Sequence, residues 1–359
     1  MTKIDAIHIR KAGSPWGRGR SNPRWSCILG VLMLSLTAFA PLADAGCSCS
    51  AVGNWEAKAQ AFLDSDDNGM QPVSPSSSQN STNAAANPAA NTLKPEDRSD
   101  SFPNDDILKP IKSVSSSDVV VDVSNGDDYA KAHVKSAIHL PTRSFLDENG
   151  NLKENEELAQ VLGNAGISRD DSVVLYGSSE SSGEAEFAFW VLSYLGQKDI
   201  MLLDGNLADW KAAGLPVESS QNKKDVVMYK PDINSEILAE YEYVKSSQAQ
   251  IADARPFTEF GKGRIPGSTA LDPANVIKGD KIKDASGLDM VFARLDKDKP
   301  IVVYSDDYSR SSLVWFALQL MGYEAATYTW EDWKDHEFKD VKEEAASTQK
   351  YVKLGKTGA

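Results

Sequence analysis

Short β-branched and apolar runs alternate with longer helical stretches over the second two-thirds of the chain. The runs typical of buried strands are residues 119–123, 173–176, 200–203, 251–254, 301–304 and 325–328. The stretches with helical spacing are an amphipathic one at 184–195, a short one at 207–213 and a third at 311–321, each followed closely by glycine. This alternation predicts an α/β fold, in which a parallel sheet carries helices on both faces.

One pattern of residues occurs twice. The matched pairs are Asp122 with Asp253, Tyr129 with Phe260, His133 with Arg264, and Trp210 with Trp333. The first three pairs share a separation of 131 residues. Because the period of a solenoid is shorter, this repeat indicates two duplicated domains. We expect a first domain over residues 105–220, a second over 221–345, and a frayed tail over 346–359.

A basic segment followed by an apolar run lies before residue 46. The basic residues are Arg10, Lys11, Arg18, Arg20 and Arg24. The apolar run covers residues 28–43, which is shorter than the roughly 20 residues that span a bilayer. Ala43-Asp44-Ala45 then matches the small-x-small pattern of a signal-peptidase site. These features predict a signal peptide over residues 1–45, with an uncleaved anchor as the alternative.

The segment over residues 46–104 contains two cysteines and a tether. Cys47 is a candidate for lipidation, since Ala45-Gly46 fits the usual box although Asp44 does not. A free Cys47 and Cys49, or a link to a partner, are the alternatives. Between residues 71 and 103, 21 of 33 residues are Ser, Pro, Asn or Ala. Such a composition cannot bury enough apolar surface to fold, and it predicts a disordered tether.

Composition excludes several classes of function. The 38 Lys and Arg residues are outnumbered by 52 Asp and Glu, for a net charge of −14. This charge opposes non-specific binding to nucleic acid or to an anionic membrane, so we expect membrane contact only through a lipid at Cys47. Four histidines and three cysteines are too few for a zinc framework, and we expect no metal or other cofactor. No cysteine follows Cys49.

Two loops follow the strands at 173–176 and 301–304, where parallel sheets carry their binding sites. The second loop consists of Ser305, Asp306, Asp307, Tyr308, Ser309, Arg310 and Ser311. A strand, a tight turn and a helix N-terminus with an arginine are typical of an oxyanion cradle. An ordinary turn capped by Asp306 or Ser309 is the alternative. The first loop, residues 177–183, has no basic residue.

Residues 105–345 resemble a tandem rhodanese-like protein. The most specific match is the segment at 202–217, which is similar to the closing motif of that family. The segment at 252–255 resembles the family's Asp-x-Arg strand, and 263–268 resembles its Gly-His-Ile-Pro-Gly-Ala turn. The resemblance implies small α/β domains with a central parallel sheet. It also implies sulfur transfer from donors such as thiosulfate, by way of a persulfide on a cysteine at the start of the loop.

The chain departs from that pattern at the cysteine. The positions that the resemblance assigns to it are Gly177 and Ser305, while Arg255, Arg310 and Ser311 match the family. The implied binding residues are therefore the second loop and Arg255. A serine hydroxyl does not replace a thiolate as the sulfur carrier, and the loop offers carboxylates rather than an obvious base.

We accordingly expect an exported, non-catalytic protein of the periplasm or cell envelope, with or without a lipid anchor. Its expected partner is an unknown envelope protein or a small sulfur oxyanion. A thiosulfate or sulfane-sulfur sulfurtransferase is the alternative. The aromatic residues Trp315, Phe316, Trp330 and Trp333 have the spacing of core residues. His133 and His336 are expected to be packing or surface residues.

Overall fold

The computed structural model describes residues 101–340 and 342. The predicted signal peptide, Cys47, all but the last three residues of the tether, and the tail at 346–359 lie outside these residues. Within the described part of the chain, no helix is long and apolar enough to cross a membrane.

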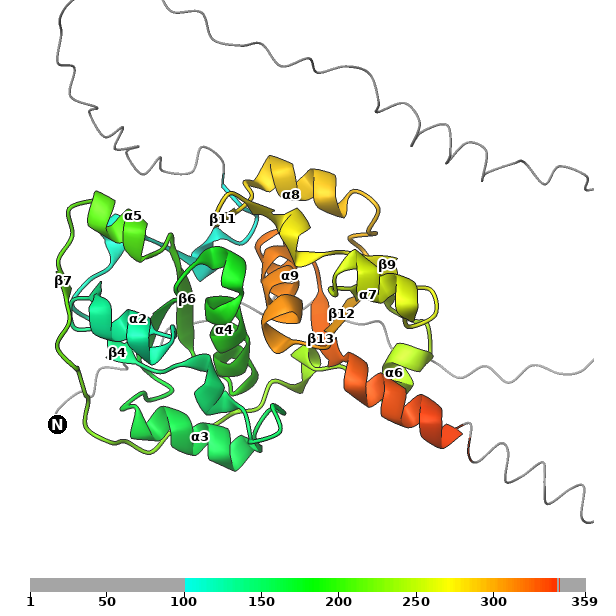
Figure 1. Cartoon of the computed structure of the whole chain (residues 1–359), viewed down its shortest axis with the longest axis horizontal. Helices are drawn as coiled ribbons and strands as arrows, with labels where there is room; N and C mark the ends of the chain where they lie inside the picture. The colour runs from blue at the N-terminus through cyan, green and yellow to red at the C-terminus, as the bar shows by residue number, and fades with distance from the viewer. Residues whose placement is uncertain (1–100, 341, 343–359) are drawn as a thin grey trace, which may run out of the picture. The chain divides into compact units, whose positions relative to one another are not determined.

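The first sheet has five parallel strands in the order β1-β6-β5-β2-β4 (Figure 1). These strands are β1 Leu108–Pro110, β2 Asp118–Asp122, β4 Ile138–His139, β5 Ser172–Tyr176 and β6 Asp199–Asp204. The helices of this half are α2 Gly126–Lys131, α3 Asn155–Asn164, α4 Glu184–Tyr194 and α5 Leu207–Ala212. A separate antiparallel pair joins β3 (His133–Val134) to β7 (Val217–Glu218).

The second sheet has four parallel strands in the order β13-β12-β8-β9. They are β8 Gln250–Asp253, β9 Thr269–Ala270, β12 Ile301–Ser305 and β13 Ala325–Thr329. The helices are α6 Tyr241–Lys245, α7 Phe257–Lys262, α8 Ala285–Phe292 and α9 Tyr308–Leu320, and residues 330–340 are also helical. A small antiparallel hairpin pairs β10 (Ile277–Lys278) with β11 (Lys281–Ile282).

Short 3-10 turns connect these elements. They are η2 Asp105–Ile107, η3 Ile111–Ser113, η4 Thr142–Phe145, η5 Glu180–Ser182, η6 Ser235–Ile237 and η7 Pro273–Val276. Helices, parallel strands and the two sheets together confirm the predicted fold class.

Equivalent hydrogen bonds establish the internal repeat. The Tyr176 hydroxyl accepts from the backbone N–H of Val134 at 2.9 Å, and the Tyr304 hydroxyl accepts from Ile265 at 3.1 Å. Each tyrosine belongs to a core cluster that contains one of the two tryptophans paired by the repeat: Trp210 with Tyr176, and Trp333 with Tyr304. The same residues therefore perform the same packing role in both halves.

Helix α4 is buried on all sides, which corrects the expectation of an amphipathic helix. Nine consecutive residues of α4, 185–193, are buried. The reason is that α4 packs directly against α9 of the second half (Figure 1). Phe189 stands edge-on to Phe316, with ring centroids 5.0 Å apart. Two central helices thus form one continuous core between the two sheets.

The segment between the two halves packs on the first one, although it falls after the expected boundary at residue 220. Residues 219–234 contain no helix or strand. The backbone N–H of Val227 donates to Gly163 at 3.0 Å, and that of Asp232 donates to Leu195 at 3.0 Å. These bonds satisfy backbone groups at the ends of α3 and α4, which explains why the segment follows the first half.

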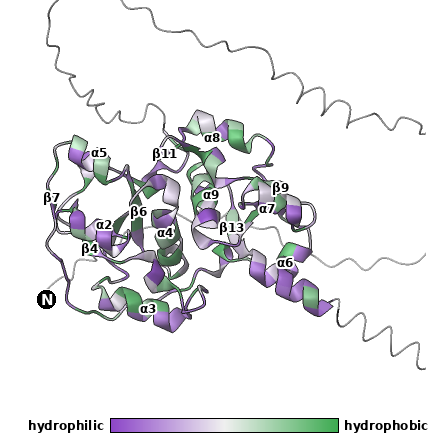
Figure 2. Cartoon of the chain, in the orientation of Figure 1, coloured by the Kyte–Doolittle hydropathy of each residue, from purple (hydrophilic) through white to green (hydrophobic). Residues whose placement is uncertain are grey.

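The aromatic residues expected in the core occupy it, with one qualification. Trp315, Phe316 and Trp333 are buried. Trp330 is only partly buried, and it packs against the core cluster of the second half. Hydrophilic residues dominate the helix at 330–340 (Figure 2), as the acidic and lysine residues of that stretch predict.

Candidate functional site

The second loop is shorter than its sequence suggests. Ser305 is the last residue of β12, and α9 begins at Tyr308 rather than at Ser311 as expected. Tyr308, Ser309, Arg310 and Ser311 consequently form the first turn of the helix. Only Asp306 and Asp307 connect strand and helix, so the connection is a tight turn directly before the helix.

Asp307 caps α9. Its carboxylate oxygen Oδ1 accepts from the backbone N–H groups of Ser309 at 2.8 Å and Arg310 at 3.2 Å. Such a cap satisfies donors that a helix N-terminus otherwise offers to an anion. The alternative interpretation of the loop, an ordinary turn, named Asp306 or Ser309 as the cap, and the structure shows Asp307 instead. The protein's own carboxylate therefore occupies the place of the expected oxyanion.

Arg310 is paired with the other loop carboxylate. Its Nη1 lies 3.1 Å from Asp306 Oδ1, and each of the two side chains is 42% exposed. An ion pair this exposed is worth about 0–1 kcal/mol, so an anion from solution can compete for Arg310. Arg310 is thus the basic residue of the loop, and its guanidinium remains within reach of solvent and is only weakly held.

The Ser305 hydroxyl lies beneath the loop and is buried. It donates to Asp306 Oδ1 at 3.2 Å and accepts from the backbone N–H of Asp307 at 3.2 Å. His133 and His336 are engaged elsewhere: the first stacks on Tyr129 and the second on Tyr241. The groups bonded to Ser305 do not include a base suited to activating a serine, and carboxylates dominate its surroundings.

The side chains of Ser311 and Tyr308 bond and pack within the fold. The Ser311 hydroxyl donates to the carbonyl oxygen of Tyr308 at 3.2 Å. The ring of Tyr308 stacks on Phe187 of the first half, with centroids 5.3 Å apart. The Tyr308 hydroxyl accepts from the backbone N–H of Leu152 at 3.2 Å. Burial raises the pKa of this tyrosine, and it stays neutral.

Arg255, predicted as a binding residue, is placed inside the second domain. Only 3% of it is exposed, and its Nε and Nη2 donate to the two carboxylate oxygens of Asp253 at 2.9 and 2.5 Å. Nη2 also donates to the carbonyl oxygen of Gly263 at 2.7 Å, and the guanidinium lies 4.1 Å from the centre of the Trp330 ring. Burial alone would lower the pKa of Arg255, but the ion pair raises it overall. Arg255 holds strand, turn and helix together rather than facing a ligand.

The first loop places a carboxylate at the position assigned to the cysteine. A Cβ built on Gly177 would lie 3.5 Å from Glu184 Oε2. The Ser178 and Ser182 hydroxyls donate to the same oxygen at 2.9 and 3.2 Å. A negative group, held by two hydrogen bonds, therefore stands where a thiolate would need positive surroundings.

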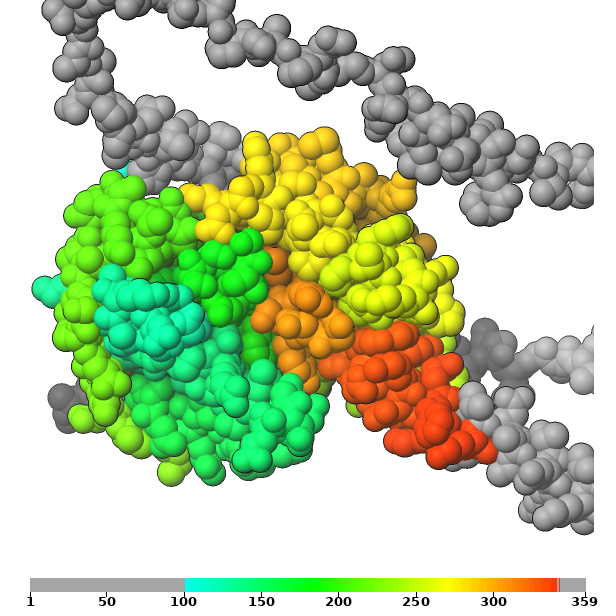
Figure 3. All heavy atoms as spheres, in the orientation of Figure 1, coloured from blue at the N-terminus to red at the C-terminus, as the bar shows by residue number. Residues whose placement is uncertain are grey.

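The β10–β11 hairpin of the second domain covers this first loop. Glu180 Oε2 accepts from the backbone N–H of Ile282 at 2.7 Å, and Asp280 accepts from Ser181 at 2.9 Å and from Asn206 at 2.8 Å. Figure 3 shows yellow atoms of the second domain against green atoms of the first. The space left beside Gly177 is about 10 Å³, which is room for about one water. This space beside Gly177 is too small for a sulfur donor such as thiosulfate.

Glu186, which lines the same small space, was not singled out from the sequence. It lies in the first turn of α4 and is 1% exposed, and its Oε2 has no hydrogen-bond partner within the described residues. Burial, with Glu180 and Glu184 nearby, raises its pKa well above the usual value. A glutamate in a first helical turn ordinarily faces solvent, so the sequence carries no signal for this one.

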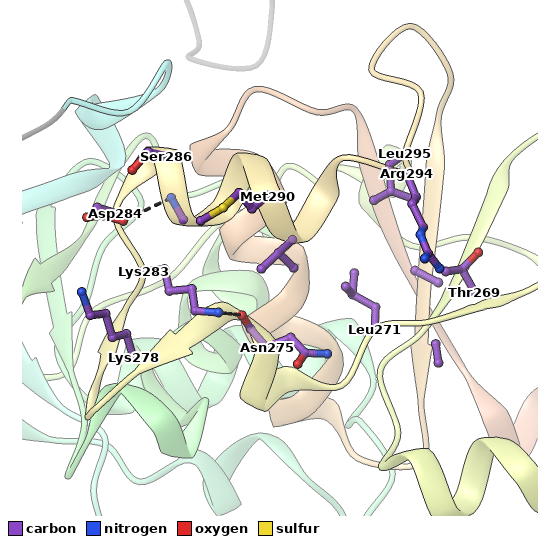
Figure 4. Close-up of a pocket in the computed structure, with 14 residues that line it drawn as sticks. Thr269, Leu271, Asn275, Lys278, Lys283, Asp284, Ser286, Met290, Arg294 and Leu295 are labelled. Atoms are coloured by element: carbon purple, nitrogen blue, oxygen red, sulfur yellow. Dashed lines mark hydrogen bonds between the residues drawn. The ribbon is translucent and has the colours of Figure 1, made fainter.

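A cavity of about 670 Å³ lies elsewhere in the second domain, between β9, α8 and the hairpin (Figure 4). None of the loop residues 305–311 lines it. Within residues 101–340 and 342, His, Cys, Asp and Glu side chains nowhere form a group of three that could hold a metal ion.

Comparison with known proteins agrees with the fold. The rhodanese-like domain matches residues 104–213 and 239–336. The "Sulfur carrier protein TtuD" of Thermus thermophilus is 30% identical over 226 residues, covering 53% of this chain and 75% of that protein. A "Putative thiosulfate sulfurtransferase" of Haloferax volcanii is 27% identical over 243 residues, covering 60% of this chain and 84% of that protein.

Solved structures resemble the same region. The 3-mercaptopyruvate sulfotransferase SseA from Escherichia coli superposes with a TM-score of 0.57 at 20% identity, covering 62% of this chain and 97% of that one. An anaerobic ergothioneine biosynthesis enzyme from Chlorobium limicola gives a TM-score of 0.58 at 20% identity, covering 66% of this chain and 70% of that one. At this level of identity the likeness concerns the fold.

Proposed function

Because the chain belongs to the rhodanese-like domain family, we propose that it is a non-catalytic member of that family, which acts by binding. The observation that carries the proposal is the chemistry at the two loop starts. Gly177 has no side chain, and the Ser305 hydroxyl is bonded to Asp306 and Asp307. Sulfane-sulfur transfer needs a thiolate that attacks the donor and then carries the sulfur. No cysteine follows Cys49.

The surroundings of both positions support the same conclusion. Glu184 lies beside Gly177, and the hairpin of the second domain covers that loop. Asp307 occupies the N–H groups of α9, and Asp306 pairs with Arg310. Negative charge beside a thiol raises its pKa, and it repels an anionic donor such as thiosulfate. Both loops therefore disfavour sulfur transfer through their nearby carboxylates, in addition to lacking the cysteine.

Binding at the second loop involves a partner that can engage Arg310. Part of its guanidinium is exposed, and the pair with Asp306 is weak enough to exchange. A small sulfur oxyanion would bind there weakly, since it gains one charge-assisted contact while the two loop carboxylates repel it. An acidic group on a protein partner would use the same arginine with additional contacts around it.

The proposed location is the periplasm or cell envelope. It rests on the basic segment, the apolar run at residues 28–43 and Ala43-Asp44-Ala45. Cys47 is the candidate for a lipid anchor, and residues 71–103 would then separate the folded part from the membrane. Mass spectrometry of the mature N-terminus tests cleavage and lipidation together.

A sulfurtransferase is the second candidate function. The names of the relatives favour it, as does the retention of Arg310-Ser311 at the end of the second loop. In such an enzyme the sulfur would have to be carried by Cys47 or Cys49, which precede the segment at 71–103, since Cys27 lies in the predicted signal peptide.

A thiosulfate:cyanide assay on the full chain distinguishes the two candidates. We expect thiocyanate release at the background rate, both for the wild-type protein and for Cys47→Ser/Cys49→Ser. Turnover by the wild-type protein would overturn the non-catalytic proposal. If the double substitution abolished that turnover, the N-terminal cysteines would be identified as the sulfur carriers.

A further inference from the structure

The cavity in the second domain combines apolar walls with basic side chains. Its volume of about 670 Å³ falls within the range of about 300–1,000 Å³ in which proteins bind small molecules. It opens to solvent beside α8, away from the loops already described (Figure 4). A role for this cavity is therefore independent of whether the loops are catalytic.

The apolar part of the lining comes from the second sheet, from α8, and from the residues that follow β9 and α8. Ala252 and Leu271 are buried beneath it, and Leu295 and Val291 form its side. Met290, also in this lining, is 76% exposed. Because methionine is unbranched and polarisable, it adapts to apolar groups of different shapes. These residues suit an apolar molecular body rather than an inorganic ion.

Three of the four charged residues that line the cavity are basic: Lys278, Lys283 and Arg294. The one acidic residue, Asp284, accepts from the backbone N–H of Gly287 at 3.2 Å as the cap of α8. The whole chain carries a net charge of −14, so this excess of positive charge is local. It favours an anion over a cation or a neutral molecule.

The basic groups retain capacity to bind. Lys283 donates one hydrogen bond to the carbonyl oxygen of Asn275 at 2.6 Å, and an ammonium group has two more to donate. Among the ion pairs of the described residues, none involves Lys278 or Arg294. In Figure 4 the Arg294 side chain lies on the far side of the cavity from Lys278 and Lys283, beside Thr269.

We propose that this cavity binds a small amphipathic organic anion, which has an acidic head group on an alkyl or aromatic body. Arg294 bonds the head group. Lys278 and Lys283, on the opposite side of the cavity, add to its overall positive potential. The body lies against Leu271, Met290 and Leu295. A guanidinium matches a carboxylate or sulfonate in plane and spacing, which is why Arg294 is assigned the direct contact.

Titration of the full chain with octanoate tests the proposal. We expect saturable binding by calorimetry, with NMR amide shifts centred on residues 285–295, and binding to the neutral analogue 1-octanol at least about tenfold weaker. Arg294→Glu should weaken octanoate binding by at least about tenfold. The matched control is Lys211→Glu, which makes the same change in net charge at an exposed residue of α5 and should bind as the wild type does.

A second variant guards against a folding defect in the first. Met290→Glu changes an exposed residue, so the fold should persist while the new charge repels octanoate from the cavity. Equal affinity for octanoate and 1-octanol, or unchanged octanoate binding in both variants, would overturn the proposal. So would shifts confined to residues 305–311. Binding to vesicles of anionic phospholipid without any response to free octanoate would also overturn it, in favour of a membrane surface.

Discussion

Gly183 in the first loop lies so close to Ser309 in the second that a Cβ on Gly183 would collide with the Ser309 carbonyl oxygen. Gly183 also has a positive φ of 70°, which favours glycine. The two loops that the repeat generates are thus in direct contact, at the point where α4 and α9 begin. A side chain added at Gly183 would therefore displace the start of α9.

Gly183→Ala should destabilise the protein by at least about 2 kcal/mol, because it combines backbone strain with a collision that only a shift of α9 can relieve. Denaturant unfolding of both proteins measures the difference. The matched control is Gly150→Ala, where φ is 86° but a Cβ would meet nothing within 4 Å. That variant should lose only about 1–2 kcal/mol. Equal losses would mean that the contact between the loops is not tight.

Ser305→Cys should be the single substitution most able to form a persulfide with thiosulfate. It places a thiol under the backbone N–H of Asp307, which would donate to the thiolate and so lower the thiol pKa, and Arg310 lies at the same loop. Gly177→Cys should form less, because Glu184 lies beside it and the hairpin covers it. Mass spectrometry of the peptide that contains each new cysteine separates it from Cys27, Cys47 and Cys49. A persulfide on Gly177→Cys alone would reverse this ranking.

Sulfate should bind the wild-type second loop with millimolar affinity or weaker, since one charge-assisted contact contributes about 1.5–3 kcal/mol and the loop carboxylates oppose it. Asp306→Ala should strengthen the binding by about threefold to tenfold, because it releases Arg310 and removes a negative charge. NMR titration of the amides at 305–311 measures both affinities. Arg310→Ala should abolish the response, and a response that survives in Arg310→Ala would place the anion elsewhere.

Glu186→Gln should raise the melting temperature at pH 8 by a few degrees, on the order expected for 1–2 kcal/mol. Burial raises the pKa of Glu186 in the folded protein above its value in the unfolded chain. Between these two values the folded state binds more protons, so stability falls as pH rises through that window and remains lower above it. Glutamine resembles the neutral acid and does not titrate. The gain in stability of Glu186→Gln over the wild type should therefore shrink as the pH falls towards 4.5.

Thermal unfolding at pH 5 and pH 8 checks this expectation. Glu156→Gln is the matched control, because Glu156 also lies in a first helical turn, that of α3, but is exposed. That variant should follow the wild type at both pH values. A pH-independent gain in Glu186→Gln would show that the glutamate is not held in its neutral form.

The strands, the repeat and the fold class were predictable because each depends on local pattern. Residues 173–176 and 301–304 are continuous apolar runs, and such runs are typical of strands buried on both faces. The pairing of Tyr176 with Trp210 and of Tyr304 with Trp333 follows from the duplicated order of residues. The absence of cysteine after Cys49 is likewise a property of the sequence alone.

Tertiary structure decided what those elements do. The sequence marks Arg255 and Arg310 alike as basic residues near the second loop, but burial and Asp253 commit the first to the fold, whereas Arg310 stays exposed. Glu186 looks in the sequence like an ordinary glutamate in a first helical turn, but in the structure it is buried, because other segments enclose the start of α4. Charge and periodicity are properties of a segment, whereas burial and the choice of hydrogen-bond partner depend on which distant segment packs against it, and that is set only when the whole chain folds.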